Sequence, residues 1–168
     1  MAGQGLFISL EGIDGSGKTT LAVYLRQYLE AEGRFLVSIR EPGGTNISEK
    51  IRQLLLDASN ESIQPWTEAI LYGAARRQLV EEIIIPVLGR GGTILADRYL
   101  DSTLAYQGYG RGLDLTMLQQ LNRICTDEVL PGLTLLLDID PNETRRRRAP
   151  DAKDRLEKEG VVFQQRVR

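Results

Sequence analysis

The chain has 168 residues, of which 42% are apolar, and this is enough for one domain with a hydrophobic core. Its formal net charge of -2 provides no overall attraction to nucleic acid or to an anionic membrane surface. The absence of histidine excludes imidazole metal sites and histidine-activated nucleophiles, while the single cysteine, Cys125, excludes an intrachain disulfide and suits the reducing cytoplasm.

The first predicted strand, 5–11, and the first predicted helix, 18–31, flank a phosphate-binding loop. Residues 12–19 match the pattern Gly-x-x-x-x-Gly-Lys-Ser/Thr, which differs from a dinucleotide-binding glycine pattern. In such a loop backbone N–H groups converge on phosphate, Lys18 supplies charge for the outer phosphates, and the Thr19 hydroxyl can bind Mg²⁺. The alternative is a glycine turn with an incidental lysine. The predicted nucleotide-binding residues are Gly12, Ile13, Asp14, Gly15, Ser16, Gly17, Lys18, Thr19 and Thr20.

A second predicted strand, 35–39, leads into the turn formed by residues 40–44, Arg-Glu-Pro-Gly-Gly. Proline restricts the residue before it, and the two glycines loosen the chain after it. Because open α/β sheets bind ligands beyond the carboxyl ends of their strands, Arg40 and Glu41 are predicted to face that crevice. A plain loop with a solvated ion pair is the alternative.

Two helices are predicted next, over 46–57 and 66–88, from apolar residues at helical spacing. Arg52 lies off the apolar face of the first. In the second, Tyr72 and Arg76 are four residues apart and therefore share one face. This pair could stack on a nucleotide base and bind its edge, but the spacing alone favours an ordinary surface contact.

The next predicted strand, 93–97, ends in a carboxylate, Asp97. An apolar strand ending in Asp is typical of the second half of a nucleoside triphosphate site, where the carboxylate holds Mg²⁺ directly or through water. Arg98 follows, and residues 99–112 concentrate hydroxyls, an amide, aromatic rings and glycines. This composition suits recognition of a polar ligand, and an ordinary polar loop is the alternative.

The last predicted elements are a helix over 115–127, a buried strand over 133–139 and a helix that begins at 143. Four consecutive arginines, 145–148, are most often a solvated face or a nucleic-acid patch. In a phosphate-transfer enzyme such a run can form a lid over the transferring group. Because a phosphate loop is present, we predict a lid over about 143–157.

Six motifs occur in a fixed order along the chain. They are the loop 12–19, Arg-Glu-Pro-Gly-Gly-Thr at 40–45, Tyr72-x-x-x-Arg76, Asp97-Arg98-Tyr99, Ser-Thr-x-x-Tyr-Gln-Gly at 102–108, and Asp-Arg-Leu-Glu at 154–157. In this order they closely resemble the bacterial thymidylate kinases, over the whole length of the chain. The resemblance implies an α/β fold, the three-layer P-loop nucleoside monophosphate kinase fold, with a parallel sheet covered by helices on both faces in a single domain, 1–168. It also implies transfer of the γ-phosphoryl group of ATP to dTMP, with Mg²⁺, in a homodimer.

The resemblance also implies roles for individual residues. Asp14 matches the acidic residue that faces the dTMP sugar, Tyr72 falls where the family usually has a phenylalanine stacked on thymine, and Arg76 falls where an arginine binds the base. The implied catalytic residues are Lys18, Asp97, Arg98, Arg148 and Arg155, and the implied metal ligands are Thr19 and Asp97. The implied substrate-binding residues are Asp14, Arg40, Glu41, Pro42, Arg52, Tyr72, Arg76, Arg98, Ser102, Thr103, Tyr106 and Gln107, with Arg40, Arg52 and Arg98 as a clamp for the acceptor phosphate.

The sequence departs from the family pattern within the binding residues and within the lid. Tyr72 adds a hydroxyl at the wall of the base pocket. Pro150 stands where related lids often carry an arginine, so the catalytic lid residue stays open among Arg146, Arg148 and Arg155.

The third departure is at the end of the chain. The chain stops at residue 168 within a predicted helix, so the family's last strand and final helix are expected to be missing. Two alternatives to a dTMP kinase therefore stay open. One is a P-loop kinase acting on another nucleotide or on a deoxynucleoside, and the other is a nucleotide-binding form without activity.

Overall fold

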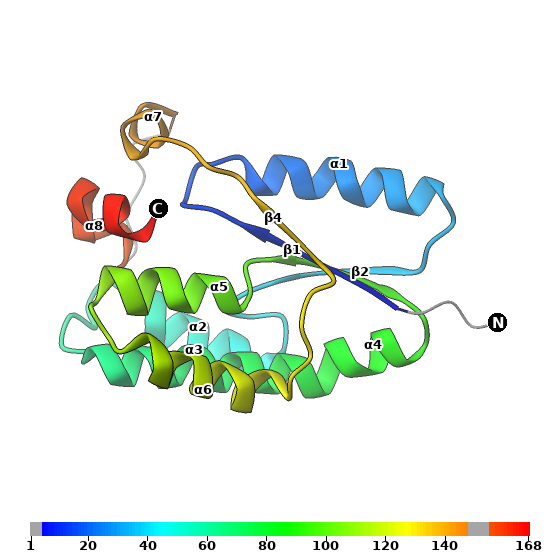
Figure 1. The fold of residues 1–168 in the computed structure, drawn as a ribbon, viewed down its shortest axis with the longest axis horizontal. Coiled ribbons are helices and arrows are strands. Elements are labelled where there is room, and N and C mark those ends of the chain that lie inside the picture. Colours follow the sequence, from blue (N-terminus) through cyan, green and yellow to red (C-terminus); the bar gives the residue numbers. More distant parts are fainter. Residues whose placement is uncertain (1–4, 148–154) are drawn as a thin grey trace.

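The computed structural model of the chain describes residues 5–147 and 155–168. Four parallel strands form one sheet in the order β2-β3-β1-β4, and helices cover both of its faces (Figure 1). The strands are β1 (Leu6–Glu11), β2 (Leu36–Arg40), β3 (Thr93–Asp97) and β4 (Leu133–Leu136). The predicted three-layer α/β fold is thus confirmed, and within the described ranges no strand follows β4.

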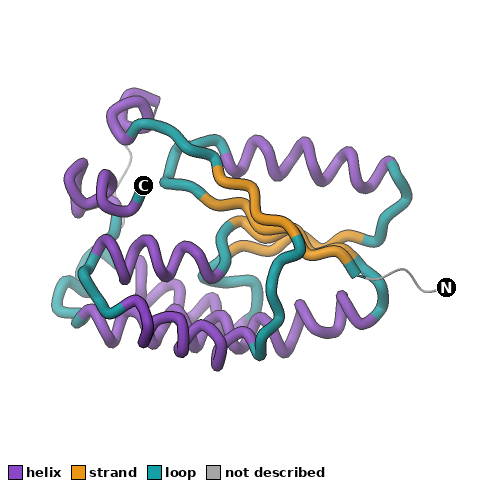
Figure 2. The backbone as a smooth tube through the Cα atoms, viewed as in Figure 1, coloured by secondary structure: helices purple, strands orange, loops and turns teal. Residues whose placement is uncertain are grey.

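The helices form two unequal layers. The helix after β1 lies alone on one side of the sheet, and most of the others lie on the opposite side (Figure 2). None of the helices in the described ranges is long and apolar enough to cross a membrane. The α-helices are α1 (Lys18–Ala31), α2 (Asn46–Leu56), α3 (Pro65–Leu79), α4 (Ile85–Gly89), α5 (Leu100–Thr103), α6 (Leu115–Thr126), α7 (Pro141–Arg147) and α8 (Gly160–Val167). Three other helical segments are the π-helical η1 (Val80–Ile84) and η2 (Leu104–Gly110) and the 3₁₀ turn η3 (Glu157–Glu159).

The two inner strands, β1 and β3, are buried on both sides because helices cover both faces of the sheet. The predicted burial of the strand over 133–139 was wrong, because β4 lies at the edge of the sheet in the described ranges, and Leu133 and Leu136 are 46% and 67% exposed. Successive side chains in a strand point to opposite faces, so neighbours enter different clusters. Phe7 belongs to a buried cluster with Leu79 of α3, and Ile8 belongs to another with Leu29 of α1. β4 ends at Leu136, earlier than the predicted 139, because its partner β1 ends at the paired residue and the phosphate loop begins there.

The helix predicted over 66–88 is a continuous helical stretch made of α3, η1 and α4. Its middle part, η1, is wider than an α-helix and ends at Ile84, two residues before Pro86. Proline has no N–H, and its ring would clash with the carbonyl four residues earlier in a regular α-helix. A π-helical turn before Pro86 accommodates this residue without ending the helix.

The segment after β3 is helical, although no helix was predicted there, and the composition of 99–112 indicated recognition of a polar ligand with an ordinary polar loop as the alternative. Two of its glycines allow close packing in η2. A Cβ on Gly108 would lie 2.5 Å from Leu115 Cδ2, and a Cβ on Gly110 would lie 2.7 Å from Phe163 Cε2. These glycines therefore let η2 approach its neighbours closely, and the polar side chains of the segment take fixed positions on a helix.

The carboxyl ends of β1, β2 and β3 meet at one edge of the sheet. Leu10 pairs with Asp97 in one direction and Arg40 pairs with Asp97 in the other. Because each strand leaves the sheet here, the phosphate loop, the turn over 40–45 and Arg98 converge at this edge. The fold thus places the candidate site where parallel α/β sheets bind ligands.

Candidate active site

A cavity of about 440 Å³ opens at this edge of the sheet. Lys18, Asp97 and Arg98, which are three of the predicted catalytic residues, line this cavity. Every residue predicted to bind the substrate also lines it. The sequence therefore located the wall of the cavity, while the binding roles of these residues stay predictions. Two apolar residues of the wall, Leu56 and Leu156, were not predicted.

The phosphate loop curls around the ammonium group of Lys18. Gly12, Gly15 and Gly17 have φ angles of 137°, 81° and 102°, which are unfavourable for other residues. Lys18 Nζ donates hydrogen bonds of 3.0 Å to the carbonyls of Gly12 and Ile13. Burial, together with the nearby charge of Arg98, lowers the pKa of Lys18 to about 8. A buried ammonium of this kind gains from an anionic partner, and a phosphate group would be one.

The guanidinium of Arg98 connects the phosphate loop to the helix after β3. Arg98 Nη1 donates to the Gly12 carbonyl at 2.8 Å and to Ser102 Oγ at 3.2 Å, while Nη2 donates to Asp14 Oδ1 at 2.7 Å and to the Tyr106 hydroxyl at 3.1 Å. Burial would lower the pKa of Arg98, but Tyr106 and Asp14 raise it above its usual range, so the group stays cationic. Its φ of 74° is strained for a non-glycine residue, and such strain tends to occur at functional sites.

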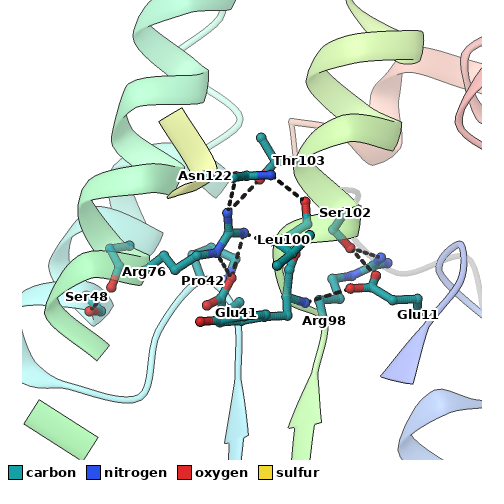
Figure 3. Close-up of polar contacts among 12 residues, drawn as sticks. Glu11, Glu41, Pro42, Ser48, Arg76, Arg98, Leu100, Ser102, Thr103 and Asn122 are labelled. Carbon is teal, nitrogen blue, oxygen red and sulfur yellow. Dashed lines mark hydrogen bonds and ion pairs between the residues drawn. The ribbon is translucent and has the colours of Figure 1, made fainter. Parts of the chain in front are cut away.

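Glu11, at the end of β1, forms a second hydrogen bond with the Ser102 hydroxyl, in addition to the one from Arg98. Its carboxylate accepts hydrogen bonds from Ser102 Oγ at 2.6 Å and from the Tyr99 N–H at 2.8 Å, and Figure 3 shows Ser102 beside both Glu11 and Arg98. Burial raises the pKa of Glu11 to about 7, although these hydrogen bonds and Arg98 act in the opposite direction. The network therefore contains a carboxyl group that titrates near neutral pH.

Replacing Glu11 with glutamine is expected to change how the stability of the protein depends on pH. The folded-state pKa of Glu11 is about 7 and its ordinary value is 4.5, so the folded state binds this proton more tightly than the unfolded state does. The resulting stability is present below about pH 4.5 and is lost as pH rises through about 7. Relative to the wild type, Glu11→Gln should therefore gain about 2–3 kcal/mol between about pH 5 and about pH 8, as measured by urea unfolding.

Glu32→Gln removes an exposed carboxylate and is the matched control for this experiment. Its stability difference from the wild type is expected to be the same at both pH values. A Glu11→Gln variant that tracks the wild type at both values would show that Glu11 does not titrate in this range.

Arg76 is the centre of a buried polar network at the back of the cavity (Figure 3). Its side chain is 2% exposed and donates to Glu41 Oε2 at 2.7 Å, Thr103 Oγ1 at 2.9 Å, Asn122 Oδ1 at 2.8 Å and the Tyr99 carbonyl at 3.1 Å. The structure thus places its donors on acceptors of the protein itself, and a role in base binding stays a prediction.

Asn122 is a member of this network that the sequence did not reveal. It lies on the buried face of α6, between Leu118 and Cys125 at helical spacing. A polar residue in the middle of an apolar helical stripe was the available signal, because buried amides are hydrogen-bonded. Asn122 Nδ2 also donates to the Leu100 carbonyl at 3.1 Å, which ties α6 to the start of α5.

Two predicted clamp arginines, Arg40 and Arg52, lie together at the turn after β2. Arg52 Nη1 donates to the Pro42 carbonyl at 2.8 Å, and Arg40 Nη2 forms an ion pair with Glu49 at 3.1 Å. Glu49 also accepts a hydrogen bond of 2.8 Å from the N–H of Gly44, and this bond, with the two arginines, lowers the pKa of Glu49. Both guanidinium groups are thus held at one wall of the cavity.

Asp97 and Thr19 provide the oxygen atoms expected of a magnesium site. Asp97 Oδ1 is buried and has no hydrogen-bond partner in the part of the chain that the structure describes. Both residues line the cavity. Mg²⁺ usually binds one or two protein oxygens and completes its shell with phosphate and water. The residues present therefore fit this ion, and no cluster of three acidic, His or Cys ligands exists among the described residues.

The predicted lid lies partly outside the described residues, and Arg148 is among those outside them. Arg146 is exposed and forms an ion pair with Glu143 at 2.8 Å. Arg155 does not line the cavity and is 6% exposed. It donates to the Leu55 carbonyl at 2.8 Å and forms an ion pair with Glu68 at 2.6 Å. A catalytic role for Arg148 or Arg155 stays a prediction.

Comparison with known proteins identifies relatives of the chain. The family model described as thymidylate kinase matches residues 10–168. A thymidylate kinase of Desulforudis audaxviator is 51% identical, over 98% of this chain and 75% of its own length. One from Deinococcus radiodurans is 49% identical, over 98% and 80%. The crystal structure of thymidylate kinase from Ehrlichia chaffeensis superposes with a TM-score of 0.76 at 37% identity, covering 92% of this chain and 78% of that one.

Proposed function

The chain belongs to the thymidylate kinase family, and from this premise we propose that it transfers the γ-phosphoryl group of ATP to dTMP, giving dTDP and ADP. The observation that carries this proposal is the single cavity shared by Lys18 of the phosphate loop and Arg98 of the strand end. A kinase must bring two mutually repelling polyanions into line, and cations fixed in one cavity do so.

The reaction needs no protein base. The acceptor is a phosphate monoester with a second pKa of about 6, so its attacking oxygen is already ionised at neutral pH. This agrees with a chain that has no histidine. In our proposal Lys18 holds the outer phosphates of ATP, and Arg98, Arg40 and Arg52 hold the acceptor phosphate.

The remaining wall of the cavity is proposed to hold the nucleoside of dTMP. Tyr72 supplies an aromatic ring for the base, Asp14 faces the sugar, and Gln107 offers an amide to the base edge. All three line the cavity. An aromatic face with a few polar groups around it is typical of sites that bind small ligands with specificity.

We further propose that Thr19 and Asp97 hold Mg²⁺. A bound ion would supply positive charge that offsets the negative charge of the phosphate groups during transfer. The unpartnered oxygen of Asp97 supports this proposal. In this proposal Asp97 and Thr19 orient the phosphate groups, and Lys18 and Arg98 offset their negative charge.

We propose one kinase domain that acts as a homodimer in the cytoplasm. Exposed apolar side chains on three neighbouring helices support the dimer, because such surfaces mark protein interfaces. They are Leu54 of α2, Ile70 of α3, and Met117 and Ile124 of α6, which are 45%, 55%, 55% and 72% exposed. The cytoplasm suits ATP-dependent chemistry and the unpaired Cys125. Light scattering of the purified protein tests the dimer, and a monomer at all concentrations contradicts it.

An assay of ADP release from ATP tests the proposed function. The purified protein is supplied in turn with dTMP, dUMP, dGMP and thymidine as acceptors. We expect dTMP to give the highest kcat/KM. A higher kcat/KM for thymidine would identify a deoxynucleoside kinase, and binding of dTMP without release of ADP would identify a nucleotide-binding protein without activity.

A further inference from the structure

Glu68 is a buried carboxylate behind the wall of the cavity, and the roles proposed above do not use it. It lies in α3 and is 0% exposed. Its Oε1 accepts hydrogen bonds from Gln107 Nε2 at 2.8 Å and from Arg111 Nε at 3.3 Å. Its Oε2 accepts one from Arg111 Nη2 at 3.1 Å and lies 2.6 Å from Arg155 Nη1. Helix α3, the segment 107–111 and Arg155, which are far apart in the sequence, therefore meet at this side chain.

Glu68 has no contact with the cavity itself, but its partner Gln107 lines the cavity. Gln107 is 2% exposed, so its amide has little freedom other than to turn about its last torsion. Such a turn would exchange the amide's oxygen and its NH₂ group, which differ only in hydrogen bonding. Whatever fixes this torsion decides whether Gln107 offers an acceptor or a donor to a ligand.

The two arginines keep Glu68 ionised. Burial would raise the pKa of Glu68, but the hydrogen bonds from Arg111 and Gln107 and the charges of Arg111 and Arg155 lower it below its ordinary value. An ionised carboxylate can only accept hydrogen bonds. The group that Gln107 turns toward it must therefore be the NH₂ group, and the amide oxygen is left on the other side.

We propose that Glu68 is a positioning residue that fixes the Gln107 amide so that its oxygen accepts a hydrogen bond from the base, and that this selects thymine over cytosine. This inference rests on the proposed function. Thymine carries a hydrogen on its ring nitrogen N3 and is a donor there, whereas cytosine has a lone pair at N3 and is an acceptor. A fixed acceptor in the pocket pairs with the N3–H donor of thymine. With cytosine, the same acceptor faces the lone pair of N3, so two acceptors oppose each other.

Replacing Glu68 with glutamine should reverse the orientation of Gln107. The oxygen of the new amide is expected to stay with the donors of Arg111 and Arg155, so the new NH₂ group faces Gln107. Gln107 then turns its own amide oxygen toward that NH₂ group. The cavity is thereby offered a donor in place of an acceptor. We expect the KM for dTMP to rise about tenfold and the preference for dTMP over dCMP in kcat/KM to fall at least about tenfold, with the KM for ATP changed less than about twofold.

Two further variants separate positioning from a structural effect. Glu159→Gln removes another carboxylate that contacts Arg111 but not Gln107, and the preference for dTMP should stay as in the wild type. In a Gln107→Ala background, the substitution Glu68→Gln should change the preference less than about twofold, because its effect acts through the missing amide. The proposal is overturned if Glu68→Gln lowers kcat/KM equally for both nucleotides, or if its effect persists without Gln107.

A measurement on the wild-type protein covers the case in which Glu68→Gln does not fold. In NMR hydrogen exchange, the side-chain NH₂ group of Gln107 should exchange more slowly than that of the exposed Gln119. Equal exchange rates contradict the proposed hydrogen bond and overturn the inference. Wild-type protein that does not phosphorylate dTMP would instead overturn the proposed function, whatever the exchange rate of Gln107.

Discussion

Replacing Arg98 with alanine is expected to lower kcat for dTMP phosphorylation by about 10³-fold or more, because one arginine at a transferring phosphoryl group contributes a factor of this size. Its guanidinium bridges the phosphate loop and η2 and lines the cavity with Lys18. Steady-state kinetics at saturating ATP and dTMP measures the effect.

The backbone strain at Arg98 allows a glycine variant at this position to serve as a control. Its φ of 74° is unfavourable for alanine as well as for arginine, but glycine adopts it freely. Arg98→Gly should therefore be more stable than Arg98→Ala by about 0.5–1 kcal/mol and equally inactive. Arg90→Ala, which removes an exposed arginine before β3, should retain wild-type kcat. Near-normal turnover in both Arg98 variants would remove this residue from the proposed clamp.

Local patterns predicted most of the fold. Apolar runs located the strands, helical spacing located α2 and α3, and the pattern at 12–19 placed the phosphate loop. No helix was predicted over 100–110, a segment that contains Gly108 and Gly110. Their packing against Leu115 and Phe163 depends on the arrangement of distant helices, and a local pattern contains no information about that arrangement.

The residues of the candidate site also divide into those that local patterns located and those that they did not. Residues within short motifs, such as Lys18 and Arg98, were located by spacing. Glu68 and Asn122 were not, since each looks like an ordinary polar residue in a helix until the fold brings its partner close. Glu68 meets Arg155, which is far along the chain, and pairing across such a distance follows from tertiary structure alone.

Replacing Arg76 with methionine is expected to destabilise the protein by about 3–5 kcal/mol, because it leaves the carboxylate of Glu41 buried without a cation. The two side chains are 2% and 5% exposed, and their ion pair measures 2.7 Å. Burial would lower the pKa of Arg76, but Glu41 raises it above its usual range, so the guanidinium is charged in the wild-type protein. The substitution therefore removes a positive charge. Methionine keeps much of the volume, so the loss reports the charge more than a cavity. Urea unfolding at neutral pH measures it.

The double variant Arg76→Met with Glu41→Leu tests this explanation. If the cost of the single variant comes from an unpaired buried charge, removing that charge as well should restore stability to within about 1–2 kcal/mol of the wild type, since apolar replacements of a buried ion pair are often tolerated. The acceptors on Thr103 and Asn122 are neutral and lose less when the guanidinium is absent. A double variant as unstable as Arg76→Met would instead assign the loss to these hydrogen bonds and to packing, and Arg76 would then stabilise the site through its whole network and not through Glu41.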